Sequence, residues 1–454
     1  MAAGKGTRMR SQRPKVLHRL AGRPLLQHVL EATAALGAGR TIVVTGHGAS
    51  EVEREIAAAP GLAFVRQEPQ HGTGHAVQQA APLLGSDEGT TLVLNGDVPL
   101  IEPATLRALV DACAGRQLAL LTVRLAEPAG YGRIVRRGDA EASIAAIVEE
   151  KDASVEQRAI DEIYTGALAA PTGALKRWLA ALRNDNAAGE YYLTDIVALA
   201  VGEGQTVAGV GAGSDTEVLG VNSPAQLADL ERRHQRATAA RLMADGVRLA
   251  DPARFDLRGE LVCGSDVEID VGCIFEGRVE LGDGVRVGAY CVLRNARVEA
   301  GALLRPYTHV DGEGLGASIG AGASVGPFAR LRGGALLGAD VHIGNFVEVK
   351  NATLGRGAKA NHLAYIGDAT LGERVNFGAG AIVANYDGAN KHRTVVGDDA
   401  HIGSNVVLVA PLQVGAGATI GAGSTLARDA PAGQLTVARV RQASLPGWKR
   451  PTKR

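Results

Sequence analysis

The stretch SIGAGASVGPFARLRGGALLGADVHIGNFVEVK, residues 318–350, places an aliphatic residue at every sixth position, from Ile319 to Val349. The same step recurs between Val396 and Leu426. A six-residue apolar period fits neither a helix of 3.6 residues per turn nor a strand of period two. It is typical of a solenoid in which each short strand contributes one inward side chain. The pattern therefore predicts a parallel β-helix of hexapeptide repeats.

The hexad pattern divides the chain into two halves. An earlier run in the same step carries it back to about residue 260, whereas the first 220 residues lack it. In that first half, β-branched runs at 41–44, 91–94 and 118–123 alternate with helix-like stretches. Such alternation predicts a Rossmann-like α/β domain with a mostly parallel sheet. We expect the following domains: 1–222 as the α/β domain, 223–250 as a linker helix that begins near Pro224, and 251–454 as the β-helix with a basic C-terminal tail.

Composition excludes several classes of function. Lys plus Arg and Asp plus Glu number 48 each, so the formal net charge is zero and no global field favours nucleic acid or an acidic membrane. The sequence has no apolar run long enough to span a bilayer and no signal peptide, which predicts a cytoplasmic protein without integral membrane association. The four cysteines form no metal-ligand spacing. Cys273 and Cys291 lie one 18-residue coil apart at inward hexad positions, where a disulfide is conceivable but buried free thiols are expected.

Two motifs in the first half are typical of phosphate chemistry. Gly4-Lys5-Gly6-Thr7-Arg8 is a glycine-rich basic turn in which backbone N–H groups can approach phosphate oxygens, with Lys15 shortly after it. Asp97 follows an apolar strand, at the edge where open α/β sheets bind ligands. Each motif also has a purely structural interpretation: the glycine-rich turn can be an ordinary loop, and Asp97 can cap the next helix.

The β-helix carries a second candidate site. Arg332 and Lys350 follow hexad aliphatic residues one 18-residue coil apart, so successive strands place these cations about 4.8 Å apart. A shared anion such as a sugar phosphate would explain two adjacent like charges; the alternative is that both side chains point into solvent. His362 lies between two phase slips of the hexad pattern, and a polar insertion with Asn385 and Tyr386 follows. A lone histidine on a solenoid is usually structural, but this one can serve as a base.

Taken in order, these motifs resemble the family of bifunctional bacterial N-acetylglucosamine-1-phosphate uridylyltransferases/glucosamine-1-phosphate N-acetyltransferases. The resemblance covers the whole chain. It is carried by Gly-x-Gly-Thr-Arg-Met, Pro14-Lys15, Asn95-Gly96-Asp97 and the hexads. It implies acetyl transfer from acetyl-CoA to glucosamine 1-phosphate, and then uridylyl transfer from UTP to N-acetylglucosamine 1-phosphate. The product would supply peptidoglycan and lipopolysaccharide synthesis. The resemblance also implies a left-handed β-helix, a homotrimer and Mg²⁺ as cofactor.

The resemblance further implies which residues form the sites. The magnesium ligands would be Asp97 and Asn222, and the catalytic base of acetyl transfer would be His362. The nucleotide and sugar of the uridylyltransferase would be bound by Ala2, Ala3, Gly4, Arg8, Lys15, Gln67, Gly72, Thr73, Asn95, Gly96, Asp97, Gly132, Glu149, Tyr164 and Asn222. The sugar phosphate of the acetyltransferase would be bound by Arg332, Lys350, Tyr365 and Asn376. Acetyl-CoA would be bound by Ala379, Asn385, Tyr386, Ser404, Ala422 and Arg439.

The sequence departs from the family pattern in three places. The family has an apolar strand immediately before the Ala-Ala-Gly turn, whereas this sequence begins at Met1, so we expect the natural start to lie upstream. A mass-spectrometric N-terminus at Met1 of the native protein would contradict that expectation. Asn95 and Tyr164 stand where the family often has Tyr and Asn, which leaves the ribose and sugar contacts open at these positions.

Two other functions compete with the bifunctional enzyme. One is a single-activity sugar-phosphate nucleotidyltransferase whose β-helix serves only for oligomerisation. The other is a non-catalytic scaffold with an inactive nucleotide domain. The coexistence of His362, the Arg332/Lys350 pair and the Asn385-Tyr386 loop disfavours the first, and Lys15, Asp97 and Asn222 disfavour the second.

Overall fold

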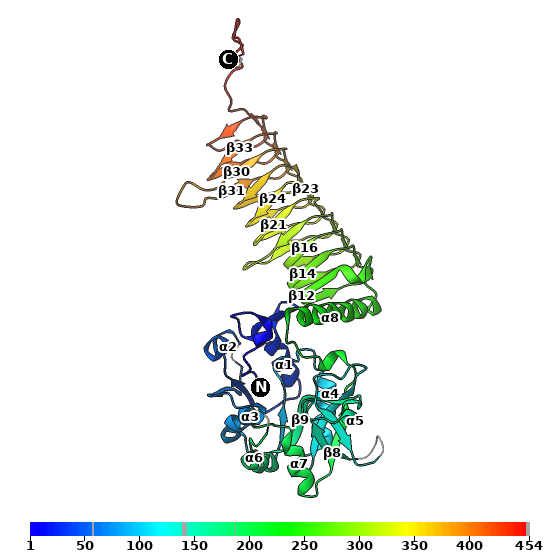
Figure 1. The fold of residues 1–454 in the computed structure, drawn as a ribbon. Coiled ribbons are helices and arrows are strands. Elements are labelled where there is room, and N and C mark those ends of the chain that lie inside the picture. Colours follow the sequence, from blue (N-terminus) through cyan, green and yellow to red (C-terminus); the bar gives the residue numbers. More distant parts are fainter. Residues whose placement is uncertain (57–58, 139–142, 187, 451–454) are drawn as a thin grey trace. The chain divides into compact units, whose positions relative to one another are not determined.

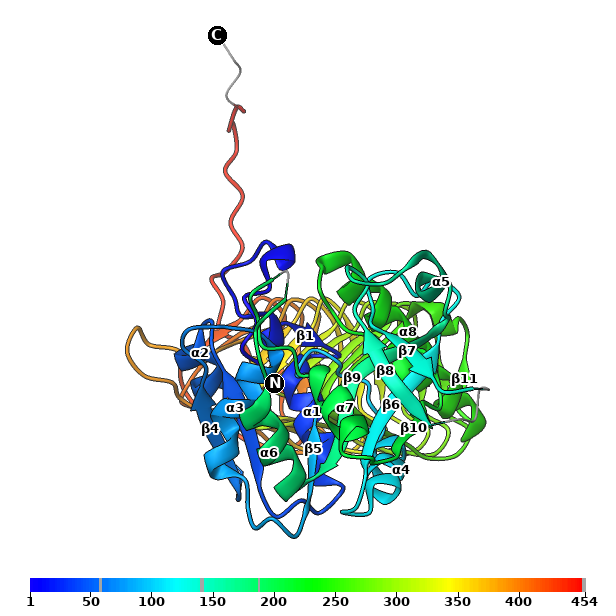
Figure 2. The same cartoon turned by 60° about the horizontal axis from the view of Figure 1, so that its bottom comes forward.

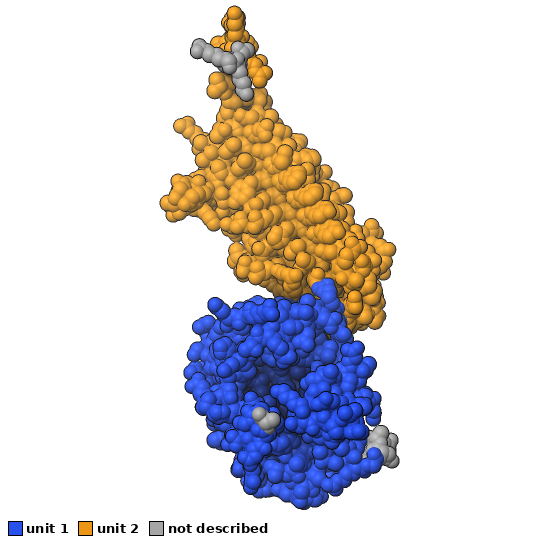
Figure 3. Space-filling view, viewed as in Figure 1, with its two compact units in different colours: residues 1–234 blue, residues 235–454 orange. Residues whose placement is uncertain are grey.

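A computed structural model describes residues 1–56, 59–138, 143–186 and 188–450. The chain forms two compact units, residues 1–234 and 235–454, which Figure 3 colours separately. The division falls inside helix α8 (Pro224–Ala244), which begins at its proline and is followed by Gly246 in a left-handed conformation. The end of the predicted basic tail, residues 451–454, lies outside the described residues.

The N-terminal unit is a three-layer α/β fold (Figures 1 and 2). Its helices are α1 (Leu25–Ala34), α2 (Ala49–Glu55), α3 (Thr73–Ala80), α4 (Pro103–Cys113), α5 (Val155–Arg158), α6 (Thr172–Ala181) and α7 (Asp195–Gly202). Its strands are β1 (Arg19–Leu20), β2 (Arg23–Pro24), β3 (Thr41–Thr45), β4 (Leu62–Arg66), β5 (Thr90–Val93), β6 (Leu118–Arg124), β7 (Arg133–Arg136), β8 (Ile144–Val148), β9 (Glu162–Pro171) and β10 (Val207–Gly211).

Strand β6 shows how the sheet is covered on both faces. Leu118 and Leu120 belong to the core formed with α6 and α7, whereas Ala119 and Leu121 belong to the core formed with α4. Because successive strand residues point to opposite faces, a continuous apolar run is the sequence of a strand buried on both sides.

The sheet itself is mixed, which differs from the mostly parallel sheet predicted. β3 pairs with β4 and β6 with β10 in parallel, but β9 runs antiparallel to β5, β6 and β7. The long strand β9 bends at a register shift opposite β6, which lets it pair with several partners. Strands β3 and β4 form a two-stranded sheet apart from the six strands that include β5.

The C-terminal unit is the parallel β-helix predicted from the hexads. Strands β12 (Phe255–Cys263), β14 (Cys273–Leu281) and β16 (Val292–Val298) cover two faces of the first coils. One face consists of β11 (Arg248–Leu249), β13 (Glu268–Ile269), β15 (Arg286–Val287), β17 (Leu303–Leu304), β20 (Ser324–Val325), β23 (His342–Asn345), β26 (Lys359–His362), β29 (Asn376–Phe377), β32 (His401–Ile402), β35 (Thr419–Ile420) and β37 (Leu435–Thr436). The second consists of β18 (His309–Asp311), β21 (Arg330–Arg332), β24 (Glu348–Lys350), β27 (Tyr365–Gly367), β30 (Ile382–Ala384), β33 (Val407–Val409) and β36 (Thr425–Leu426). The third consists of β19 (Ala317–Ile319), β22 (Ala335–Leu337), β25 (Ala352–Leu354), β28 (Ala369–Leu371), β31 (Thr394–Val396) and β34 (Leu412–Val414).

The inward hexad residues form one continuous column of buried apolar side chains, most of them aliphatic, from Val267 to Ala430. Cys273 and Cys291 are part of this column as free thiols, as expected, and burial raises the pKa of Cys273 to about 12. Their role is packing rather than reactivity.

The phase slips in the hexad pattern are shortened coils. Ser324 pairs with His342 across a full 18-residue coil, but His342 pairs with Lys359 and Lys359 with Asn376, each one residue short of that. The polar insertion then lengthens the next coil and projects from the side of the β-helix (Figure 1). The candidate acetyltransferase residues lie on and beside these irregular coils.

Candidate active sites

Lys15, Asp97 and Asn222 meet in the N-terminal unit. Lys15 begins a short 3₁₀ turn after Pro14, and Asp97 follows β5. The backbone N–H of Val221 donates to the carbonyl of Asp97 at 3.0 Å, which holds the Asn222 segment beside it. Lys15 Nζ lies 2.5 Å from Asp97 Oδ2 and 3.0 Å from Asn222 Oδ1. The fold thus unites three predicted residues that are far apart in the sequence.

The donor set of this cluster fits Mg²⁺. Asp97 offers a carboxylate oxygen and Asn222 an amide oxygen, which are hard ligands of the kind that Mg²⁺ prefers. Across the residues that the structure describes, no group of three or more His, Cys, Asp or Glu side chains could hold a metal ion. Two protein ligands suffice where substrate phosphates and waters complete the coordination, as is usual for Mg²⁺.

The predicted N-terminal turn is fixed at its start and open at its tip. Ala2 donates from its backbone N–H to the Val44 carbonyl at 2.8 Å, and Gln70 Nε2 donates to the Ala3 carbonyl at 2.9 Å. Gly4 and Arg8 are exposed, so their backbone and guanidinium groups are accessible to an anion.

Gln67, Gly72 and Thr73 lie together around the beginning of α3. Gln67 is buried, and its Nε2 lies 2.9 Å from the Gly72 carbonyl and 3.1 Å from His75 Nδ1. Thr73 Oγ1 accepts from the Leu193 N–H at 3.0 Å. His75 was not predicted, because its contact with Gln67 depends on α3 packing beside the end of β4.

Gly132, Glu149 and Tyr164 form a neighbouring group. Tyr164 donates its backbone N–H to the Gly132 carbonyl at 2.9 Å, and an added Cβ at Gly132 would lie 3.7 Å from the Glu149 carboxylate. Thr194 Oγ1 donates to Glu149 at 3.3 Å, yet burial raises the pKa of Glu149 above its ordinary value. The Tyr164 hydroxyl is buried and has no hydrogen-bond partner among the described residues. A ligand hydroxyl or carbonyl would satisfy it.

Asn95 and Gly96 lie at the end of β5. An added Cβ at Gly166 would stand 2.1 Å from Asn95 Nδ2. The Asn95 side chain can therefore occupy its position only because residue 166 has no side chain. The Gly96 N–H donates to the Met1 carbonyl at 2.8 Å.

Three cations gather on the second face of the β-helix. Arg332 Nη1 lies 2.9 Å from Glu348 Oε1, so a carboxylate partly offsets the charge of the predicted pair. The pKa of Lys350 is lowered, first by the side chain of Lys391 and then by burial and Arg332. Lys391 comes from the polar insertion. The sequence did not identify it as a site residue, because its position beside Lys350 depends on how the insertion folds. The three cations therefore form a candidate anion site, in which the carboxylate of Glu348 holds Arg332 by an ion pair.

His362 lies at the end of β26, exposed to solvent. Its Nδ1 is 2.9 Å from Asn345 Oδ1, one shortened coil earlier. Because an amide oxygen only accepts, Nδ1 donates the hydrogen bond and Nε2 carries the lone pair. Asn345 was not predicted, and it fixes the tautomer in which His362 can take a proton.

Asp368 connects the two predicted ligand regions. Its carboxylate is buried and accepts from Asn351 Nδ2 and from Asn385 Nδ2, each at 2.5 Å. These three residues recur every 17 residues, the length of the shortened coils. That spacing in the sequence could have identified Asp368, which lies next to Lys350 through Asn351 and next to the insertion through Asn385.

Tyr365 and Asn376 occupy different faces. Tyr365 lies in register with Glu348 on the second face, and its hydroxyl lies over Gly367, which pairs with Lys350. Asn376 lies in register with Lys359 on the face that carries His362. The structure thus brings Tyr365 to the cations, whereas it shows no contact of the Asn376 side chain with them.

The predicted acetyl-CoA residues follow successive coils. Hydrogen bonds link Asn405 N–H to the Ala379 carbonyl and Gly423 N–H to the Ser404 carbonyl, both at 2.8 Å. Arg439 Nη1 donates to the Ala422 carbonyl at 2.6 Å. Tyr386 is exposed in the insertion, where it bridges to Lys391 and its hydroxyl donates to the Gly388 carbonyl at 2.6 Å.

Comparison with known families supports the fold predicted for each half of the chain. Residues 1–198 match the MobA-like NTP transferase domain, and residues 393–428 match the bacterial transferase hexapeptide family of six repeats. The latter repeats, together with the parallel strand ladders, identify the C-terminal unit as the left-handed β-helix that the family resemblance implies. Within the described residues, no helix has the length and apolar character needed to cross a membrane.

Relatives match the chain over its whole length. It is 70% identical to Bifunctional protein GlmU of Methylibium petroleiphilum, covering 100% of this chain and 98% of the relative. It is 65% identical to Bifunctional protein GlmU of Acidovorax sp. (strain JS42), again covering 100% and 98%. The corresponding protein of Bordetella parapertussis is 59% identical, with the same coverage. The chain therefore belongs to the GlmU family of bifunctional enzymes, the uridylyltransferase/acetyltransferase family that its sequence resembles.

Proposed function

We propose that the two units of this bifunctional enzyme carry separate reactions at the two clusters described above. The domain at 1–222 transfers uridylyl from UTP to N-acetylglucosamine 1-phosphate and releases pyrophosphate. The domain at 251–454 transfers acetyl from acetyl-CoA to glucosamine 1-phosphate, and 223–250 links them. The observation that carries the proposal is the presence of both the Lys15–Asp97–Asn222 cluster and the His362–Asn345 pair in a chain of this family.

Acetyl transfer follows from the geometry around His362. The cations Arg332, Lys350 and Lys391 bind the sugar phosphate, and Tyr365 and Asn376 bind the sugar. His362 Nε2 takes the proton from the amino group as its nitrogen attacks the thioester carbonyl. A carbon–nitrogen bond forms, the carbon–sulfur bond breaks, and the CoA thiolate leaves and is protonated.

The co-substrate acetyl-CoA is proposed to lie along the edge formed by the insertion and later coils. The residues proposed to bind it are Ala379, Asn385, Tyr386, Ser404, Ala422 and Arg439. Small residues at three of these positions permit a close approach of a narrow ligand, and the Arg439 guanidinium is exposed for its phosphates.

Uridylyl transfer uses the N-terminal cluster. A phosphate oxygen of the sugar phosphate attacks the α-phosphorus of UTP, and the bond from that phosphorus to the bridging oxygen breaks to release pyrophosphate. Mg²⁺, held by Asp97 and Asn222, would supply charge neutralisation for the phosphates. Lys15 exchanges its contacts with these two side chains for phosphate oxygens when the ligands bind.

The remaining uridylyltransferase residues are proposed to bind the nucleotide and the sugar. The turn at Ala2, Ala3, Gly4 and Arg8 contacts the phosphates through backbone N–H groups and a guanidinium. The base and sugar are bound by Gln67, Gly72, Thr73, Asn95, Gly96, Gly132, Glu149 and Tyr164. The unpartnered hydroxyl of Tyr164 supports a direct contact with the sugar.

We also propose that the β-helix assembles as a homotrimer in the cytoplasm. One corner of the β-helix carries an exposed row of Tyr290, Tyr307, Phe328, Phe346 and Leu363. The four rings stack with centroids 5.0–5.5 Å apart, and Leu363 immediately follows His362. An exposed apolar row of this length is typical of a protein interface, and a second copy on it would border the acetyl site.

The test measures each product separately. Release of CoA thiol from acetyl-CoA with glucosamine 1-phosphate should be abolished by His362→Ala and unaffected by His309→Ala, an exposed histidine on an earlier coil. Release of pyrophosphate should be abolished by Asp97→Ala and unaffected by Asp111→Ala, an exposed aspartate on α4. Loss of both activities in one folded variant would contradict separate sites. Thiol release that persists without His362 would contradict its role as the base.

A further inference from the structure

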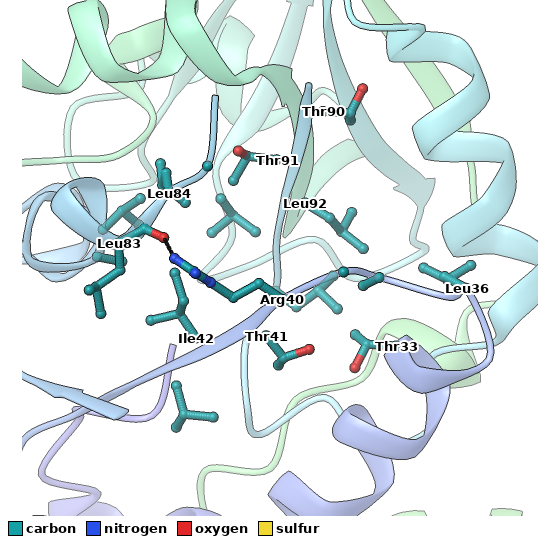
Figure 4. A pocket seen from close by; sticks show the side chains of 18 of the residues that line it. Thr33, Leu36, Arg40, Thr41, Ile42, Leu83, Leu84, Thr90, Thr91 and Leu92 are labelled. Atoms are coloured by element: carbon teal, nitrogen blue, oxygen red, sulfur yellow. Dashed lines mark hydrogen bonds between the residues drawn. The ribbon is translucent and has the colours of Figure 1, made fainter. Parts of the chain in front are cut away.

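Two different regions of the N-terminal unit adjoin helix α3. One is an apolar pocket of about 520 Å³ along β3 and β5, and Figure 4 shows Ile42 and Leu92 among the side chains that line it. The other is the polar cluster of Gln67 and His75 at the carboxyl end of β4, and neither residue lines that pocket. The polar cluster is the one that offers directed hydrogen bonds to a ligand.

Gln67 lies beside the turn that is proposed to bind the phosphates. Its backbone N–H donates to the Thr45 carbonyl at 2.8 Å, and Thr45 is bridged to Ala2 at the start of that turn. Gln70 Nε2 also donates to the carbonyl of Ala3 at 2.9 Å. These segments meet at the carboxyl ends of parallel strands, where open α/β sheets bind nucleotides. A nucleotide with its phosphates on the turn can therefore place its base at Gln67.

Both hydrogens of the Gln67 side-chain amide are used within the protein. Nε2 donates to the Gly72 carbonyl at 2.9 Å and lies 3.1 Å from Nδ1 of His75. The Gly72 segment is itself held in place, because the Gly74 N–H donates to the Tyr191 carbonyl at 2.8 Å. A carbonyl oxygen only accepts, so the amide nitrogen must face Gly72, and its second hydrogen is directed at the His75 ring.

The His75 ring is suited to accept that hydrogen. Burial, and then the nearby His71, lower the pKa of His75 below its ordinary value, so the ring is neutral at pH 7 and has one lone-pair nitrogen. Because Nδ1 is that nitrogen, Nε2 carries the hydrogen and faces the side-chain amide of Gln79 at 3.0 Å. A half turn of the Gln79 amide gives up a 3.3 Å bond to the His75 carbonyl and places its oxygen there. Gln79 thus fixes the tautomer of His75.

The side-chain oxygen of Gln67 is left for a ligand. Across the described residues it accepts no hydrogen bond, and it is not among the buried atoms that lack a partner, so it faces open space. An oxygen at this position accepts from a base that carries an N–H, as uracil does at N3. It repels a base with a lone pair at the same place, as cytosine has at N3.

We propose that His75 is a positioning residue that selects the base of the nucleotide. By accepting from Gln67 Nε2, it leaves the Gln67 oxygen as the group that faces the base, which favours UTP over CTP. This inference rests on the proposed uridylyltransferase function, in which Gln67 binds the base, and adds to it the group that orients Gln67. Without His75, the amide can turn about its last bond and present an N–H, which would pair with cytosine.

The test compares two nucleotides on each full-length variant. Pyrophosphate release with N-acetylglucosamine 1-phosphate is measured for UTP and for CTP, and the readout is the ratio of the two kcat/KM values, which does not depend on how much of a sample is folded. His75→Ala should lower the ratio about tenfold, which corresponds to the loss of about one hydrogen bond. His75→Asn should restore the ratio, because Asn Oδ1 can accept in place of Nδ1. His71→Ala removes the neighbouring ring, 5.4 Å away, and should leave the ratio unchanged.

Four results would overturn the proposal. An unchanged ratio in His75→Ala, or a ratio in His75→Asn as low as in His75→Ala, would show that an acceptor at Nδ1 does not select the base. An equal fall in His71→Ala would show a general effect of ring packing. A parent chain that releases no pyrophosphate from UTP, while the same sample releases thiol from acetyl-CoA, would refute the proposed uridylyltransferase function itself.

Discussion

Replacing Asp368 tests whether one buried carboxylate organises the acetyltransferase half. Asp368→Ala removes the acceptor of two amide hydrogen bonds, from Asn351 and from Asn385, in a buried setting. Hydrogen bonds to charged groups contribute about 1.5–3 kcal/mol each, so the loss should be about 3–6 kcal/mol. Asp368 also has φ of 48°, a left-handed conformation that costs alanine about a further 1–2 kcal/mol.

The effect should be local. Each coil of a solenoid contacts only its neighbours, so the coils that contain these three residues should open more easily while distant coils stay protected. The loss of the two hydrogen bonds alone, about 3–6 kcal/mol, corresponds to roughly a 10²- to 10⁴-fold increase in local opening. Hydrogen–deuterium exchange of peptides spanning residues 350–394 measures it directly. The Michaelis constant for acetyl-CoA should rise as well, because Asn385 loses its anchor.

Two companion variants separate the causes. Asp368→Asn tolerates the left-handed backbone and keeps one acceptor oxygen, so its exchange should fall between those of the parent and the alanine variant. Asp399→Ala breaks an exposed ion pair with Arg374 on the same β-helix, and Asp399 has a left-handed φ of 56° as well. It therefore carries a similar backbone cost without the loss of buried hydrogen bonds, and its exchange should rise much less than that of Asp368→Ala. If Asp368→Ala exchanges no faster than Asp399→Ala, the reasoning about the buried carboxylate is refuted.

Three further predictions concern single side chains. Burial raises the pKa of Glu149 above its ordinary 4.5, so the stability that its protonation provides is present below pH 4.5 and is lost as pH rises through the raised value. Glu149→Gln should therefore gain in melting temperature relative to the parent between pH 4 and pH 7, and a constant difference would contradict this. Lys391→Gln should raise the Michaelis constant for glucosamine 1-phosphate about tenfold with little change in kcat, because one cation beside Lys350 is lost; an unchanged constant would exclude Lys391 from the phosphate site. Gly344→Ala places a Cβ 1.9 Å from the Asn361 carbonyl oxygen, so thiol release should fall by roughly 10²-fold while pyrophosphate release stays unchanged; equal loss of both would show a global folding defect instead.

The N-terminal site shows what spacing in the sequence can and cannot specify. A glycine-rich turn and an Asp after an apolar strand are local signals, and both lie where the open sheet binds ligands. That Lys15 contacts Asp97 and Asn222 depends on three distant segments meeting, and the bond from Val221 to Asp97 forms only when they do. The antiparallel pairing of β9 escaped prediction for the same reason, since strand direction is set by long-range packing and not by the strand's own residues.

The β-helix was determined by its sequence to an unusual degree. A solenoid repeats one local rule, an inward aliphatic residue every six positions, so the coil, its core and its phase slips are all readable from the chain. What only the tertiary structure decided are the contacts between side chains on irregular coils: Asn345 on His362, Asp368 between two amides, and Lys391 beside Lys350. Repetition fixes the backbone wherever coils follow the six-residue period. The chemistry depends on where that period fails, and on which side chains the shortened and lengthened coils bring together.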